Sequence, residues 1–252
     1  MIKRIAVSND SEDRLREITE AVQKAGGHTA PIAAAAQLPP GTAAVVAGDP
    51  NWPGAVENAL TMARWHEELL FLLAEALDCR EGFVRGSSQR VMEHGARFAL
   101  AADLSRDDQF VLERAALLRG VGKIRVGNEI LLKEGLLTYD EWRLIHEYPR
   151  FGADVLRQAG ALSDVADVVG KHRENYDGDG YPDGIEGDAI PYMARMLNIA
   201  DVYCAMTSPR HYRQGHASHD EAAAYLRSEQ GKHFDPDLID VFIDGEVGQP
   251  RA

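Results

Sequence analysis

Apolar residues recur at helical spacing through most of the chain from about Gln89 onward. Repeats at three and four residues mark one face of an amphipathic helix, whereas a half-buried strand alternates at every second residue. The segments with this helical spacing are 91–104, 107–118, 139–146, 151–159 and 163–171. Two capping boxes predict where helices begin: Thr138 with Glu141, and Ser218 with Glu221. The sequence therefore predicts a mainly α domain over 86–252.

The N-terminal residues 1–54 carry a different pattern. The run KRIAVSND and the run at 42–48 are typical of buried strands, and HTAPIAAAAQLPP between them has room for another. A helix is predicted from its cap at Ser11 to Gly26. This small α/β segment resembles the first half of a response-regulator receiver, with Asp49 where the phosphate-accepting aspartate ends a strand. We expect a truncated receiver-like segment, and a small α/β cap without chemistry is the alternative for Asp49.

The segment 55–85 joins these two parts. Its apolar residues, among them Leu60, Leu69, Leu73 and Leu77, recur at the spacing of a long amphipathic helix. Such a helix could pack on its own domain or pair with a second copy in a homodimer. The sequence leaves both alternatives open because it contains few clean heptads.

Charge and cysteine content limit the partners and the compartment. A net charge of −13 argues against broad binding to nucleic acid, which needs a basic surface. Cys79 and Cys204 are far apart and form no CxxC motif, which fits a reducing compartment. The N-terminus turns acidic too early for a signal peptide, and no apolar run approaches the roughly 20 residues of a membrane helix. We expect a cytoplasmic protein without a membrane segment.

The segment YDGDGYPDGIEGD is a long loop rich in glycine and aspartate. With its neighbours over 171–213, it closely resembles the HD-GYP family, and the tripeptide Gly180-Tyr181-Pro182 is in place. The resemblance covers about 89–244. It implies an HD-type helical bundle that binds two or three metal ions and hydrolyses the bacterial messenger cyclic di-GMP, which has two phosphodiester bonds.

Hydrolysis of a phosphodiester needs metal ions that bind phosphoryl oxygens and generate hydroxide, so imidazoles and carboxylates must converge from several helices. The resemblance implies that three such ligands are kept, namely His94, His172 and Asp201. It also implies that ligands are replaced at these positions: Arg90, Arg119 and Gly120 of the name-giving doublet, Tyr148, Arg173 and Cys204. The lysine that follows the doublet is kept as Lys123.

The two arginines at former ligand positions, Arg119 and Arg173, change the expected chemistry. A guanidinium is permanently charged, can fill the space of a divalent ion, and repels an entering metal. We therefore expect no metal and no catalytic residue. In the alternative, a single iron or manganese ion is retained by His94, His172 and Asp201, with Lys123 as a catalytic residue.

Recognition of an anion needs only cationic and hydrogen-bonding side chains, whereas catalysis also needs bound metal ions. The resemblance implies ligand-binding roles for the basic pair in SPRHYR and for the loop tyrosine, and charge-assisted hydrogen bonds could add two arginines. The expected ligand-binding residues are Tyr181, Arg210, Arg213, Arg119 and Arg173. The family's loop is also associated with contacts to GGDEF domains, so a signalling protein is the other expected partner.

The sequence therefore predicts a non-catalytic regulatory protein of the cyclic di-GMP network, acting through the nucleotide, a partner, or both. The alternative is a residual metal-dependent phosphodiesterase.

Overall fold

The computed structural model describes residues 5–8, 29–32, 43–45, 52–80, 86–208 and 215–249, with side chains from Trp65 onward. The chain divides into two compact units, Met1–Phe71 and Leu72–Ala252. The boundary falls inside the segment predicted as a linking helix, whose residues 55–80 belong to the single helix α2 (Trp52–Arg80). The predicted three-part division into 1–54, 55–85 and 86–252 stays a prediction.

The first unit contains a parallel three-stranded sheet in the order β2-β1-β3. The central strand β1 (Ile5–Ser8) pairs with β2 (Thr29–Ile32) on one side and with β3 (Ala43–Val45) on the other. Each of the three short apolar runs of the sequence thus contains a strand, as predicted. The helix predicted after Ser11 and the residue Asp49 lie outside the described residues.

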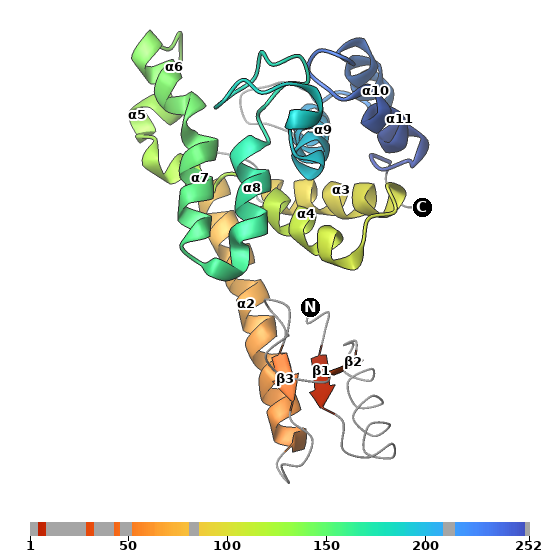
Figure 1. Cartoon of the computed structure of the whole chain (residues 1–252). Coiled ribbons are helices and arrows are strands. Elements are labelled where there is room, and N and C mark those ends of the chain that lie inside the picture. The colour runs from red at the N-terminus through yellow and green to blue at the C-terminus, as the bar shows by residue number, and fades with distance from the viewer. Residues whose placement is uncertain are drawn as a thin grey trace. The chain divides into compact units, whose positions relative to one another are not determined.

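The second unit is built from helices (Figure 1). After α2 its elements are α3 (Ser87–Ala101), α4 (Arg106–Leu118), η2 (Val121–Arg125), α5 (Asn128–Leu131), α6 (Tyr139–His146), α7 (Tyr148–Arg157), η3 (Gly160–Leu162), α8 (Ser163–Lys171), η4 (Gly187–Ala189), α9 (Tyr192–Thr207), α10 (His219–Ser228) and α11 (Pro236–Asp244). Each helix predicted from the apolar spacing is present, with its ends shifted by a few residues. Both predicted capping boxes are also present, at the starts of α6 and α10.

Helix α9 lies at the centre of this unit. It packs against α3, α4, α8, α10 and α11, and Figure 1 shows these helices around it. The apolar residues of α9 lie on all sides of the helix, which is typical of a buried helix. Among them, Met196, Leu197 and Ile199 have no exposed surface. A polar residue on such a helix is carried into the core, and Asp201 is one of them.

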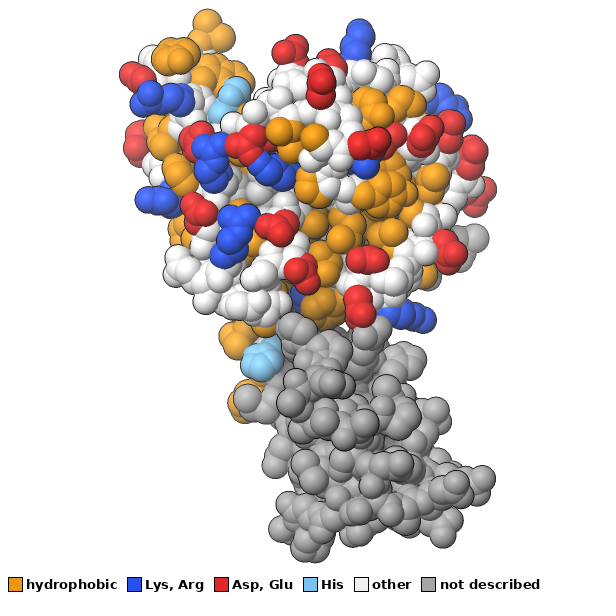
Figure 2. All heavy atoms as spheres, viewed as in Figure 1, with side chains coloured by type: hydrophobic (Ala, Val, Ile, Leu, Met, Phe, Trp, Pro, Cys, Tyr) orange, Lys and Arg blue, Asp and Glu red, His pale blue; other side chains and the backbone are white. Residues whose placement is uncertain are grey.

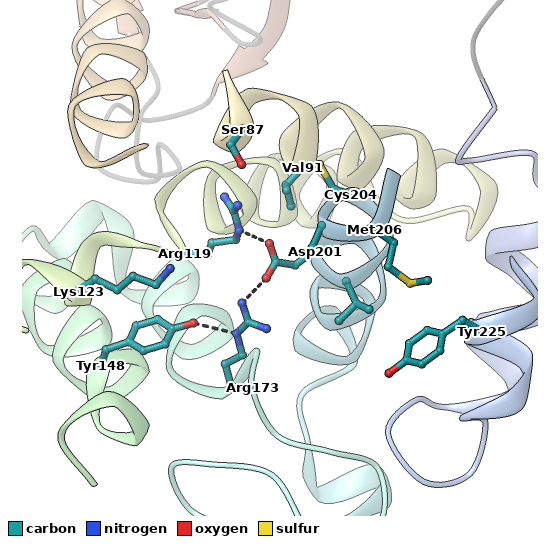
Figure 3. Close-up of a pocket in the computed structure, with 12 residues that line it drawn as sticks. Ser87, Val91, Arg119, Lys123, Tyr148, Arg173, Asp201, Cys204, Met206 and Tyr225 are labelled. Atoms are coloured by element: carbon teal, nitrogen blue, oxygen red, sulfur yellow. Dashed lines mark hydrogen bonds and ion pairs between the residues drawn. The ribbon is translucent and has the colours of Figure 1, made fainter. Parts of the chain in front are cut away.

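A glycine allows the short η2 helix to lie directly on the start of α7. A Cβ atom at Gly122 would stand 1.9 Å from the carbonyl oxygen of Tyr148, so any larger residue would force the two elements apart. This close approach brings Lys123 of η2 and Tyr148 of α7 to the same side of the bundle (Figure 3).

The described surface carries acidic and basic side chains mixed with apolar ones, as the face in Figure 2 shows. Within the described residues, no helix combines the length and the apolar character needed to cross a bilayer.

Candidate functional site

A cavity of about 580 Å³ opens where α3, η2, α7 and α9 meet the end of α4 (Figure 3). Its lining residues are Ser87, Val91, Arg119, Lys123, Tyr148, Arg173, Asp201, Val202, Cys204, Ala205, Met206 and Tyr225. We refer to it as the central pocket. Three cationic side chains and one carboxylate line it, so its wall is positively charged within an acidic protein.

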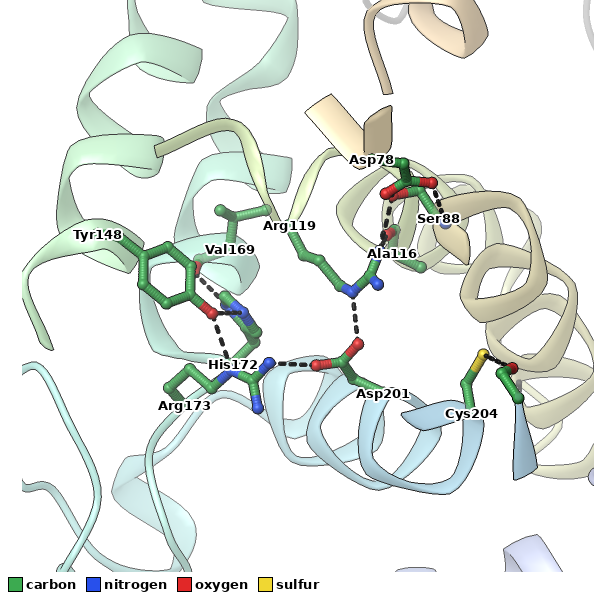
Figure 4. Close-up of polar contacts among 11 residues, drawn as sticks. Asp78, Ser88, Ala116, Arg119, Tyr148, Val169, His172, Arg173, Asp201 and Cys204 are labelled. Atoms are coloured by element: carbon green, nitrogen blue, oxygen red, sulfur yellow. Dashed lines mark hydrogen bonds and ion pairs between the residues drawn. The ribbon is translucent and has the colours of Figure 1, made fainter. Parts of the chain in front are cut away.

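Asp201 is held by two guanidinium groups. Arg119 Nε donates to Asp201 Oδ1 at 2.5 Å, and Arg173 Nη2 donates to Asp201 Oδ2 (Figure 4). Both carboxylate oxygens therefore face a permanent positive charge. Burial alone would raise the pKa of Asp201, but the two arginines hold that pKa well below its usual range. Asp201 is ionised at any physiological pH.

Arg119 is anchored on its far side as well. It follows the last residue of α4, and its Nη1 donates to the Ala116 carbonyl at 3.0 Å and to Ser88 Oγ at 3.1 Å. Ser88 in turn donates from its backbone N–H and its hydroxyl to Asp78, at 2.7 Å each. Burial would lower the pKa of Arg119, but Asp201 raises it. Arg119 thus acts as an internal ion-pair partner that ties α3, α4 and α9 together.

Both ring nitrogens of His172 are used within the protein. Its Nδ1 lies 2.6 Å from the Val169 carbonyl, which can only accept, so Nδ1 carries the proton. Its Nε2 therefore accepts from the Tyr148 hydroxyl at 3.0 Å, and that hydroxyl accepts from Arg173 Nε at 2.8 Å. Burial, with the charge of Arg173, lowers the pKa of His172 to about 3.

These residues do not fit a metal ion. A ligating histidine needs an available nitrogen lone pair, and the Nε2 lone pair of His172 is taken by Tyr148. The carboxylate oxygens of Asp201 are both engaged by arginines. Across the part of the chain that the structure describes, no group of three or more His, Cys, Asp and Glu side chains is arranged to hold a metal.

His94 does not join His172 and Asp201. Its Nδ1 lies 3.3 Å from the Val247 carbonyl, and its ring meets the edge of Tyr203 at 5.2 Å between centroids. It lines a second cavity, of about 930 Å³, about two turns further along α3 than Ser87. The hypothesis of one ion shared by His94, His172 and Asp201 is therefore not supported by their positions.

The α3 residues that face the central pocket are Ser87 and Val91. Sequence reasoning missed Ser87 and its neighbour Ser88, and it expected the first ligand of the family pattern seven residues later on the same helix, at His94. The spacing of 87 and 91, one helical turn, is the signal that could have identified this face.

The glycine-rich loop lies against α7 and places Tyr181 beside the pocket rather than in its wall. The Tyr181 ring stacks on His146 with centroids 4.1 Å apart and planes within 2°. The loop is fixed by Glu174, whose carboxylate accepts from the backbone N–H groups of Asp183 at 2.8 Å and Ile185 at 3.2 Å. Tyr181 also meets the Tyr148 ring of the pocket wall edge to face, with centroids 6.4 Å apart, so it stands next to the residues that surround Asp201.

The positions of the remaining predicted site residues are as follows. Lys123 lines the central pocket, with its ammonium nitrogen 5.2 Å from the centroid of the Tyr148 ring. Cys204 is buried, which raises the pKa of its thiol. Arg210 and Arg213 lie outside the described residues.

Comparisons with a family model, with known sequences and with solved structures all point to the same family. The family model described as HD domain matches residues 72–238. The cyclic di-GMP phosphodiesterase response regulator RpfG of Xanthomonas campestris pv. campestris is 37% identical over 187 residues, which are 71% of this chain and 48% of that protein. The 3'3'-cGAMP-specific phosphodiesterase 2 of Vibrio cholerae is 31% identical over 180 residues, 71% of this chain and 34% of that protein.

The cyclic di-GMP phosphodiesterase PA4108 of Pseudomonas aeruginosa is 41% identical over 152 residues, 58% of this chain and 35% of that protein. The chain thus spans less than half the length of each of these relatives. Among solved structures, the cyclic GMP-AMP specific phosphodiesterase V-cGAP3 of V. cholerae aligns with a TM-score of 0.59 at 23% identity, covering 73% of this chain and 49% of that one, which shows a shared fold. The chain belongs to the HD domain family and is homologous to the HD-GYP cyclic di-GMP phosphodiesterases.

Proposed function

We propose that this chain is a non-catalytic signalling protein of the cyclic di-GMP network that recognises a phosphodiester anion on a phosphodiesterase scaffold. The observation that carries the proposal is the double ion pair of Asp201 with Arg119 and Arg173. Two guanidinium groups bind both oxygens of the carboxylate that a catalytic metal would need as a ligand. Their positive charge opposes the entry of a cation. A metal-bound water is the source of hydroxide near neutral pH in such hydrolases, so a site that excludes the metal would lack this nucleophile.

The pocket keeps features that suit an anion. Arg119, Lys123 and Arg173 bring three cations against the single carboxylate of Asp201. Arg119 is largely committed to internal hydrogen bonds and its side chain is 10% exposed, whereas the side chain of Arg173 is 27% exposed. Arg173 and Lys123 would therefore contact a phosphate, and a cavity of this volume is within the range of small-molecule sites.

The first experiment measures metal content and turnover together. Purified full-length protein is analysed for metals and then assayed for hydrolysis of cyclic di-GMP with added iron or manganese. We expect no stoichiometric metal and no turnover. Clear, metal-dependent turnover would contradict the proposal.

The second experiment titrates cyclic di-GMP into the protein in a calorimeter. We expect binding that weakens at least tenfold in Arg173→Gln and in Lys123→Gln, because each change removes one charged contact worth about 1.5–3 kcal/mol. Arg150→Gln is the matched control, since Arg150 is an exposed arginine outside the pocket lining. Equal weakening in all three variants, or no heat with the parent protein, would count against nucleotide recognition.

A residual metal-dependent phosphodiesterase is the second candidate, and the relatives favour it. The three relatives described above are all named as phosphodiesterases of cyclic dinucleotides. In that case the role of Lys123 would be catalytic, and Arg173 or Arg119 would have to release Asp201 before an ion could bind. Turnover that disappears in Asp201→Asn while the protein stays folded would support this candidate.

A protein partner such as a GGDEF domain is the remaining form of the proposal. Large apolar side chains are exposed along the segment that follows η2, at Leu132, Leu136, Tyr139 and Trp142. Exposed apolar patches of this kind mark interaction sites. Binding of a purified GGDEF domain that is lost in Trp142→Ser, with no heat from cyclic di-GMP, would favour an adaptor over a nucleotide sensor.

For the N-terminal unit we keep the proposal of a truncated receiver-like segment. The parallel order β2-β1-β3 is how a flavodoxin-like sheet begins, the type found in receivers. Incubation with a small phosphodonor should leave the chain unphosphorylated, and phosphorylation at Asp49 would contradict this proposal.

A further inference from the structure

The central pocket has two ends with different chemistry (Figure 3). Lys123 and Tyr148 lie at one end, where η2 meets the start of α7, and Arg173 lies between this end and α9. Met206 of α9 and Tyr225 of α10 lie at the opposite end. Cationic groups are therefore concentrated toward one end of the pocket, and a thioether and an aromatic ring form the other.

The end formed by α9 and α10 has few groups that can hydrogen-bond. The lining residues that α9 contributes after Asp201 are Val202, Cys204, Ala205 and Met206. The Cys204 thiol is a weak donor, and it lies 3.4 Å from the hydroxyl of Ser208. Among the described lining residues, the hydroxyl of Tyr225 is thus the one strong hydrogen-bonding side-chain group at this end.

The ring of Tyr225 is ordered within the protein itself. Helix α10 is anchored by Ala222, Ala223 and Leu226, which are buried, whereas Tyr225 is 38% exposed. The Tyr225 ring meets the buried ring of Phe234 edge to face, with centroids 6.3 Å apart and planes at 77°. A ring that is already held in one orientation loses little conformational entropy when a ligand stacks on it.

A ligand that fills both ends of the pocket combines an anion with a flat ring. Its phosphate would contact Arg173 and Lys123, and its ring would stack on Tyr225 with the thioether of Met206 beside it. Nucleotides have this combination, and every nucleobase has a face that stacks on an aromatic side chain.

We propose that Tyr225 and Met206 form a stacking subsite for a purine base and that this subsite does not select between guanine and adenine. This inference rests on the proposed function, because it takes a phosphodiester to be bound at the cationic end. Guanine and adenine share a stacking face and differ at their edges, so a site distinguishes them by hydrogen bonds to those edges.

The chemistry of the subsite explains the lack of selection. An apolar site rejects a ligand of similar shape only weakly, because it leaves no buried polar group without a partner. The Tyr225 hydroxyl can both donate and accept, so it can pair with the carbonyl oxygen of guanine or with the amino group of adenine.

The first test compares three cyclic dinucleotides by calorimetric titration into the full chain: cyclic di-GMP, cyclic di-AMP and 3'3'-cGAMP. We expect their dissociation constants to lie within about tenfold of one another. A preference of more than about tenfold for one of them would overturn the proposal.

The second test changes the ring. Tyr225→Ser should weaken the binding of all three nucleotides by at least about fivefold, because it removes the stacking face. Tyr225→Phe keeps the ring and should retain most of the affinity. Tyr192→Ser is the matched control, since Tyr192 is 43% exposed at the start of α9 and does not line the pocket. Circular dichroism checks that each variant is folded.

The outcomes separate this inference from the proposed function. Binding that weakens in Arg173→Gln but not in Tyr225→Ser would keep the proposed function and overturn the subsite, as would equal weakening in Tyr225→Ser and Tyr192→Ser. Metal-dependent turnover would overturn the proposed function, whereas the subsite would stand if Tyr225→Ser still weakened binding of all three nucleotides. No heat from any of the three nucleotides would overturn both.

Discussion

Two buried carboxylates in the second unit are satisfied in opposite ways. Asp201 on α9 is neutralised by two guanidinium groups, whereas Glu174 in the glycine-rich segment accepts hydrogen bonds from the backbone N–H groups of Asp183 and Ile185. Accordingly the pKa of Asp201 lies well below its usual range, and burial raises the pKa of Glu174. One carboxylate determines the electrostatics of a pocket, and the other determines the shape of a loop.

The difference indicates how much stability the protein would lose if each carboxylate were replaced. A carboxylate held by backbone amides can be replaced by another acceptor of similar shape at modest cost. A carboxylate that compensates two buried cations cannot, because its removal leaves charge in the core without a counter-charge. Four predictions test this contrast.

The largest effect is expected from Asp201→Asn. This change leaves Arg119 and Arg173 without their counter-charge, and breaking a buried pair costs about 3–5 kcal/mol of unfolding free energy. Urea unfolding followed by circular dichroism measures the loss. A loss no greater than that of Glu174→Gln would remove the contrast between the two carboxylates.

The second prediction concerns acid. The pKa of His172 is lowered from 6.5 to about 3 in the folded protein, so below pH 6.5 the unfolded chain binds a proton that the folded chain does not. Stability should therefore fall as the pH drops from 6.5 toward 3, by about 1.4 kcal/mol per pH unit from this residue once its unfolded form is protonated.

The measurement for this second prediction is the unfolding free energy as a function of pH, for the parent and for His172→Gln. The variant should have the shallower acid slope. His216→Gln, at an exposed histidine, is the control and should keep the slope of the parent. Identical slopes for all three proteins would contradict the assignment of a neutral, buried His172.

The third prediction is a smaller loss for Glu174→Gln, of about 1–1.5 kcal/mol. The amide retains one acceptor oxygen for the loop, but its NH₂ group cannot accept from the second backbone N–H. Equilibrium unfolding gives the size of the loss, and hydrogen exchange at Asp183 and Ile185 shows whether it is local. Exchange that is unchanged at both amides would argue against this role of Glu174.

The smallest effect is expected at the edge of the loop. Arg150 is 44% exposed and contacts Glu147 and Asp183. Exposed ion pairs are screened by water and salt, so Arg150→Ala should cost about 0–1 kcal/mol. Unfolding at high salt should give a smaller difference from the parent than unfolding at low salt. A loss comparable to that of Asp201→Asn would mean that surface charge, not buried charge, stabilises this region.

Local patterns in the sequence were enough for the secondary structure. Helix α6 begins at its capping box at Thr138 because the capping residues are three positions apart and need no distant partner. The same holds for α10. The resemblance to the family also predicted that Arg119 and Arg173 stand at positions where ligands are expected, and this assignment stays a prediction.

The geometry of the site could be predicted only in part. His94 was expected beside His172, but it lines the second cavity, about two helical turns along α3 from Ser87, and its position relative to the central pocket depends on which helices pack over each part of α3. The neutral state of His172 depends on Val169 and Tyr148, which come from two different helices. No local pattern contains that information.

The sequence by itself determined that most of the chain is helical and where helices begin, because these properties depend on neighbours within a few residues. Only the tertiary structure decided that Arg119 and Arg173 converge on one carboxylate and that Ser87 rather than His94 faces them. Convergence depends on how helices pack, and packing joins residues that lie far apart in the chain.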